Sequence, residues 1–71
     1  RVELYERFEF IKQAEGVSAL LVTHDLREAR RLAEYLIILH QGAIQQQGAT
    51  SEVLAEPATA YVRSLVESQL A

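Results

Sequence analysis

The first predicted element is a helix, because apolar positions recur at helical spacing from the start of the chain. Leu4, Phe8 and Ile11 stand at i, i+4 and i+7 within residues 2–14, and charged side chains cover the opposite face. This spacing predicts an amphipathic helix. Gly16 follows shortly afterwards and is expected to end it, because glycine readily adopts the left-handed conformation found after a helix C-terminus.

A strand–helix–strand unit follows the first helix. Residues 18–22 form a mostly apolar run, typical of a strand buried on both faces of a parallel sheet. Residues 26–33 return to a helical pattern, with Asp25 as the expected N-cap and Glu28 completing a capping-box pattern. Residues 35–39, Tyr-Leu-Ile-Ile-Leu, predict a second strand, which a helical crossover would place parallel to the first.

The second half of the chain predicts a hairpin and two helices. Residues 40–42 indicate a turn, after which residues 43–47 are expected to return antiparallel as an exposed edge strand. Thr50 is the expected N-cap of a short helix that ends near Ala55, and residues 58–70 predict the last helix. The order helix-strand-helix-strand-strand-helix-helix places the chain in the α/β class.

Composition and charge exclude several classes of function. The 71 residues are 49% hydrophobic and 24% charged, which is typical of one small globular domain at most. The sequence has no cysteine and two well-separated histidines, so neither a disulfide nor a local metal site is predicted. A net charge of −3 argues against binding to nucleic acid. No apolar run approaches the roughly 20 residues that span a bilayer.

His24 is the strongest candidate for chemistry, because it follows the first strand, where open α/β sheets bind ligands. An imidazole can both orient a reactant and stabilise charge near neutral pH. On these residues alone, a strand-end histidine bonded to local backbone is the simpler interpretation. Arg27, Arg30 and Arg31 are expected to form a solvated helix face, and His40 is expected to be exposed at the hairpin turn.

Several short motifs occur in a fixed order along the chain. They are Leu-Val-Thr-His-Asp at residues 21–25, Glu-Ala-x-x-Leu-Ala at 28–33, Ile-Ile-Leu at 37–39, Gly-x-Ile-x-Gln-x-Gly at 42–48, Glu52, and Pro-Ala at 57–58. In this order they resemble the last part of the ATP-binding subunits of ATP-binding cassette (ABC) transporters, around their H-loop or switch region. The resemblance implies that residues 1–71 are a C-terminal fragment of one nucleotide-binding domain of the P-loop NTPase fold.

The resemblance also implies a function for the intact parent protein. His24 matches the switch histidine, which contacts the γ-phosphate of ATP and helps to position the attacking water. The parent would be an ATPase that uses ATP and Mg²⁺. Its partners would be a second ATPase subunit and integral-membrane permease subunits, at the cytoplasmic face of the cell membrane. The run from Glu56 to Ala58 is similar to the end of importers of small polar solutes, including osmoprotectants.

The isolated chain is expected to lack this activity. The family's phosphate-binding loop, Gln loop, signature motif and Walker B carboxylates lie upstream of the matched region, and no counterpart occurs in these residues. Phosphates are held mainly by such a glycine-rich loop with its lysine and by a metal-binding carboxylate. No ATPase activity, bound nucleotide or bound metal is therefore expected for the 71 residues alone.

The resemblance implies an incomplete sheet. In the family, the strand that carries the phosphate-binding loop lies between the strands matched here by residues 18–22 and 35–39. Three arrangements remain open: direct pairing of these two strands, exchange of elements between two copies, or helices packed without the sheet. Unpaired strand edges recruit other chains, so a homodimer or higher oligomer is expected. The alternative to an ATPase segment is a non-catalytic self-association module, either α/β or helical.

Overall fold

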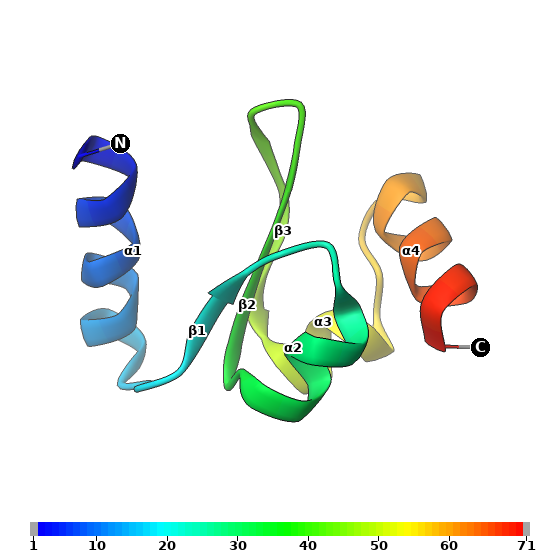
Figure 1. The fold of residues 1–71 in the computed structure, drawn as a ribbon, viewed down its shortest axis with the longest axis horizontal. Helices are drawn as coiled ribbons and strands as arrows, with labels where there is room; N and C mark the ends of the chain where they lie inside the picture. Colours follow the sequence, from blue (N-terminus) through cyan, green and yellow to red (C-terminus); the bar gives the residue numbers. More distant parts are fainter. Residues whose placement is uncertain (1, 71) are drawn as a thin grey trace.

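The computed structural model describes residues 2–70, with side chains from Glu6 onward. Seven elements follow the order that the sequence predicts (Figure 1). They are α1 (Val2–Glu15), β1 (Leu20–Val22), α2 (Leu26–Leu32), β2 (Tyr35–His40), β3 (Ala43–Ala49), α3 (Thr50–Ala55) and α4 (Ala60–Leu70). The expected apolar position Leu4 lies outside the side chains that the structure describes.

The three strands form one mixed sheet in the order β1-β2-β3. β1 runs parallel to β2, with Leu20 opposite Tyr35, and β3 runs antiparallel to β2. Of the three arrangements left open by the sequence, the structure has direct pairing of the two parallel strands. β1 was expected to be buried on both faces, and this expectation is wrong, because an edge strand leaves its three residues half-exposed.

The central strand β2 separates two apolar cores. Successive side chains of a strand point to opposite faces, so Leu36 and Ile38 face one side and Tyr35 and Ile37 face the other. The first pair packs against α2, α3 and α4, and the second pair packs against α1 through Ile11. Figure 1 shows α1 on one side of the sheet and the other three helices on the opposite side.

Glycines mark two of the predicted chain reversals. Gly16 has φ +68°, and the amides of Gly16 and Val17 donate to the carbonyls of Gln13 and Lys12, which is the Schellman pattern that ends a helix. Gly42 has φ +80°, so the expected hairpin turn is confirmed. Positive φ at two successive turn residues matches the twist of the strands that flank a two-residue loop.

The capping of α3 differs from the expectation. Thr50 is the first helical residue and not the N-cap, which is Ala49. Its N–H donates to the carbonyl of Glu34 at 3.0 Å, and its hydroxyl is buried with no hydrogen-bond partner among the residues that the structure describes. This backbone bond continues the pairing between the two ends of the β2–β3 hairpin, and the side chain of Thr50 is buried. α4 begins later than expected, at Ala60, and Thr59 Oγ1 accepts from the amide of Val62 at 3.1 Å.

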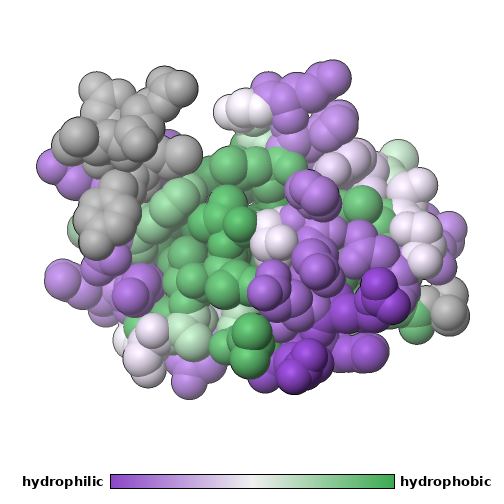
Figure 2. Space-filling view, viewed as in Figure 1, coloured by the Kyte–Doolittle hydropathy of each residue, from purple (hydrophilic) through white to green (hydrophobic). Residues whose placement is uncertain are grey.

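The surface of the molecule is partly apolar. Figure 2 shows a continuous hydrophobic region over the part of the molecule where β1 lies in Figure 1. Phe10 and Leu32 are 71% and 57% exposed. Within residues 2–70, no helix combines the length and the apolar character needed to cross a bilayer.

Candidate functional site

His24 lies in the three-residue connection between β1 and α2, and it is exposed. The strand pairing continues to the start of this connection, because the amide of Thr23 donates to the carbonyl of Ile37 at 3.2 Å. The carboxyl end of β1 and the first turn of α2 therefore hold the backbone of His24 from both sides. This is the position that the sequence predicts for a ligand-facing residue.

Two side chains next to His24 stabilise the connection. Thr23 Oγ1 accepts from the amide of Asp25 at 2.9 Å, and Asp25 Oδ1 accepts from the amide of Glu28 at 3.1 Å. Asp25 is therefore the N-cap of α2, as the sequence predicts. The reciprocal half of the capping box is not formed, because the amide of Asp25 bonds to Thr23 and not to the side chain of Glu28.

Gln69, near the end of α4, makes the longest-range contacts with this connection. Its Nε2 donates to the carbonyl of His24 at 2.6 Å, and its Oε1 accepts from the amide of Leu26 at 2.8 Å. A role for this residue was not predicted from the sequence. A signal for it exists, since Gln69 lies seven residues after Val62 and three after Val66, on the apolar face of α4, where a polar side chain needs a partner.

The exposed imidazole of His24 can donate a hydrogen bond to an anionic oxygen or accept one from water. Its backbone is bonded, while its ring is open to solvent. Among the side chains that the structure describes, no group of three His, Cys, Asp or Glu residues could hold a metal ion. The arrangement can therefore orient one polar contact to a ligand held by other groups.

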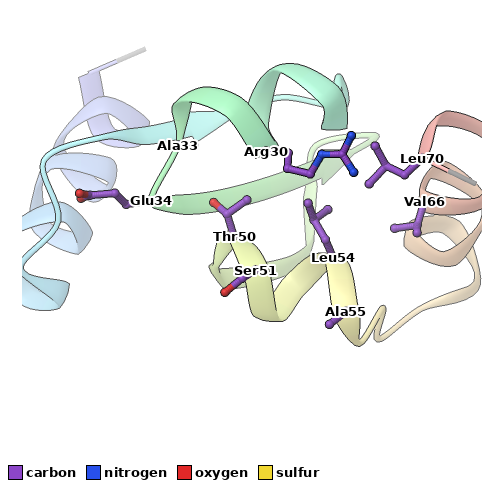
Figure 3. A pocket seen from close by; sticks show the side chains of 9 residues that line it. All are labelled: Arg30, Ala33, Glu34, Thr50, Ser51, Leu54, Ala55, Val66 and Leu70. Atoms are coloured by element: carbon purple, nitrogen blue, oxygen red, sulfur yellow. The ribbon is translucent and has the colours of Figure 1, made fainter.

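The other candidate residues lie away from this connection. Arg27, Arg30 and Arg31 are exposed on α2. Arg30 borders a groove of about 720 Å³ between α2, α3 and α4, and Figure 3 shows its guanidinium on the side of Leu70. His24 is not among the residues that line this groove. His40 was expected to be exposed, but it is half-buried, because its ring packs against α4.

No protein-family model matches the chain, but several known proteins are similar to it over most of its length. An sn-glycerol-3-phosphate import ATP-binding protein, UgpC of Rhizobium meliloti, is 37% identical over 68 residues, which are 96% of this chain and 20% of the relative. An Fe(3+) ions import ATP-binding protein, FbpC 2 of the same organism, is 32% identical over 66 residues, or 93% of this chain and 17% of the relative.

A third relative comes from another organism. The spermidine/putrescine import ATP-binding protein PotA of Mycoplasma capricolum is 31% identical over 68 residues, which are 96% of this chain and 19% of the relative. All three relatives are import ATP-binding proteins, and their names give different cargoes. The chain spans about a fifth of the length of these curated relatives.

Proposed function

Because this chain is homologous over most of its length to the ATP-binding subunits of ABC importers, we propose that it supplies the switch histidine of such a subunit. In this proposal His24 contributes to the ATP hydrolysis that drives uptake of a small polar solute. The observation that carries the proposal is the placement of His24: it is exposed after the carboxyl end of a parallel strand, with backbone hydrogen bonds on both sides.

The exposed position of His24 supports the role proposed for it. Catalysis of phosphoryl transfer depends on positioning and on stabilisation of charge. An imidazole N–H on a fixed backbone can donate to an oxygen of the γ-phosphate and keep the attacking water in line. Thr23 and Asp25 hold the connection in shape, so little ordering of the backbone remains for the moment of reaction.

Among the described residues, His24 is the only one that we propose to contact ATP. They contain neither a cluster of metal-ligating side chains nor a loop with the glycines and lysine that cradle phosphates. We therefore propose that other parts of a full-length subunit hold the nucleotide and the metal. The metal would neutralise charge on the phosphates. On its own, the 71-residue chain would then have no ATPase activity and no measurable affinity for Mg-ATP.

The proposed partners follow from the importer relatives. A second ATPase subunit would complete the nucleotide site, and integral-membrane permease subunits would use the energy of hydrolysis. Such an assembly would place the chain at the cytoplasmic face of the cell membrane. The relatives' names give sn-glycerol-3-phosphate, Fe(3+) ions and spermidine/putrescine as cargo, and on this basis we propose uptake of a small polar solute.

The experiment that tests this function compares wild-type and His24→Ala forms of a full-length subunit that carries this segment. ATP affinity and ATP turnover are measured separately, because a switch histidine acts on the reaction more than on binding. Slower turnover at an unchanged ATP affinity supports the proposal, and unchanged turnover counts against it.

A second candidate function is a non-catalytic self-association module, which the open edge of β1 favours. The amide of Thr23 and the carbonyl of Ala19 bond to β2. Since the direction of backbone groups alternates along a strand, those of Leu20 and Val22 point away from β2. Their side chains are half-exposed. An unprotected edge of this kind pairs with another strand, so we propose that the isolated chain forms a homodimer through β1.

A further inference from the structure

We propose that Gln69 is a positioning residue for His24. In this proposal it couples the end of α4 to the orientation of residues 23–25, the connection between β1 and α2, which we call the switch loop. This inference rests on the proposed function of His24. The observation behind it is a pair of hydrogen bonds that the side-chain amide of Gln69 makes with the loop. The amide donates to the carbonyl of His24 at 2.6 Å and accepts from the backbone N–H of Leu26 at 2.8 Å.

The two bonds fix the backbone on both sides of Asp25. A carboxamide has a donor end and an acceptor end, and here the donor faces the His24 carbonyl while the acceptor faces the Leu26 N–H. The peptide that leaves His24 is thus held in one orientation. Rotation of that peptide would move the Cα–Cβ direction of His24, and with it the imidazole. Gln69 therefore acts on the ring without touching it.

The Leu26 N–H needs such a partner. Leu26 is the first residue of α2, and the first N–H groups of a helix have no acceptor within the helix. Its side chain is fully buried, so its backbone has little access to water. Asp25 caps the amide of Glu28 and leaves that of Leu26 to another group. Gln69, which lies 43 positions further along the chain, supplies the missing acceptor.

The packing of α4 determines whether Gln69 reaches the loop. Val62 is fully buried in the cluster that contains Leu26 and Ala29 of α2, and Val66 packs against the same cluster. Gln69 continues this face of α4 and is half-buried. A shift of α4 along α2 would pull the amide away from the His24 carbonyl. The position of α4 is thereby coupled to the alignment of His24.

The first test measures amide hydrogen exchange in the 71-residue chain by NMR. Gln69→Ala should lower the protection of the Leu26 amide about tenfold, the size expected when a bond worth about 1.4 kcal/mol is lost. Gln69→Glu keeps the acceptor for Leu26 but places a carboxylate against the His24 carbonyl. This variant should therefore keep the Leu26 protection and still shift the amide resonance of Asp25.

The matched control is Gln13→Ala, which removes the same side chain from an exposed position on α1. It should leave the Leu26 amide unchanged. Unchanged Leu26 protection in Gln69→Ala would overturn the inference, since the amide then has no bond to lose. If Gln69→Ala fails to fold, the decision rests on Gln69→Glu, where an unchanged Asp25 resonance would overturn it.

The second test asks whether the loop geometry matters for turnover in a full-length subunit that carries this segment. Gln69→Ala and Gln69→Glu should each lower kcat about tenfold with an unchanged ATP affinity, because the ring of His24 would be misaligned. In the His24→Ala background the same substitutions should add nothing further, since the group they position is gone.

The outcomes separate the inference from the proposed function. Additive losses in the double variants would mean that Gln69 acts by another route, and unchanged turnover in both Gln69 variants would also overturn its positioning role. If His24→Ala itself turns over normally, the proposed function fails, and the positioning role in catalysis fails with it. The exchange of the Leu26 amide would still decide whether Gln69 holds the loop.

Discussion

The rings of His40 and Tyr61 stack with their centroids 3.9 Å apart and their planes inclined by 25°. His40 is the last residue of β2, and Tyr61 lies in the first turn of α4. The stack therefore joins the tip of the hairpin to the last helix, between residues 21 positions apart. Its existence explains why His40 is half-buried although it stands directly before a turn.

Removing one ring of this stack should destabilise the fold. We expect Tyr61→Ala to lower the free energy of unfolding by about 2 kcal/mol, part of it from lost apolar burial and part from lost stacking. Tyr61→Phe keeps the ring and should change it by less than about 0.5 kcal/mol. Urea denaturation checks both values. A double-mutant cycle with His40→Ala should give a coupling of about 1 kcal/mol, and a coupling of zero would rule out the stack.

Gln46 should stabilise the connection between α3 and α4. Its Nε2 donates to the carbonyl of Glu56 at 3.0 Å, and its Oε1 accepts from the amide of Ala58 at 2.8 Å. These exposed bonds are worth about 1 kcal/mol together, so Gln46→Ala should lower the free energy of unfolding by that amount. Gln45→Ala, at the neighbouring bulge of β3, is the control. Equal effects of the two substitutions in urea denaturation would contradict this assignment.

Replacing Thr50 by valine should stabilise the chain. The Thr50 hydroxyl is buried and has no hydrogen-bond partner in the described part of the chain, and a buried unpaired polar group is costly. Valine keeps the shape and removes that cost, so the free energy of unfolding should rise by about 1 kcal/mol. Ser51→Ala, at the exposed next position, should change it by less than about 0.5 kcal/mol. A marked loss of thermal stability in Thr50→Val would show that the hydroxyl has a partner.

The open edge of β1 predicts the assembly of the isolated chain. Sedimentation velocity at micromolar concentration should show a dimer. Val22→Lys should shift it to the monomer, because an edge lysine opposes strand pairing between chains. Phe10→Ser, which changes an exposed apolar residue of α1 and not a residue of β1, should leave the dimer intact. A folded wild-type monomer at these concentrations would refute the proposed pairing.

Local patterns predicted most of the fold. The helical spacing around Phe8 and Ile11, the Asp25 cap and the Gly42 turn depend on neighbouring residues, so they can be derived from short stretches of sequence. The direct pairing of β1 with β2 could not be derived, since short-range patterns do not determine which strands become neighbours. The half-exposure of β1 follows from that pairing.

The residues that were missed depend on contacts that are distant in sequence. Thr50 has the right residue type for an N-cap, but its backbone is held by the carbonyl of Glu34, which moves the cap to Ala49. The role of Gln69 depends on where α4 packs, and no motif near it indicates that. The position of His24 at a strand end was predicted from the sequence, whereas its catalytic role remains a prediction.

The central claim is that His24 serves ATP hydrolysis, and single-turnover hydrolysis in a full-length subunit that carries this segment tests it most directly. His24→Ala is compared with wild type and with Gln13→Ala, which changes an exposed residue of α1. We expect His24→Ala to bind ATP with wild-type affinity and to hydrolyse it at least about 10²-fold more slowly, the scale of a positioned charge-stabilising group. Gln13→Ala should hydrolyse ATP at the wild-type rate. Hydrolysis by His24→Ala at the wild-type rate would contradict the switch role.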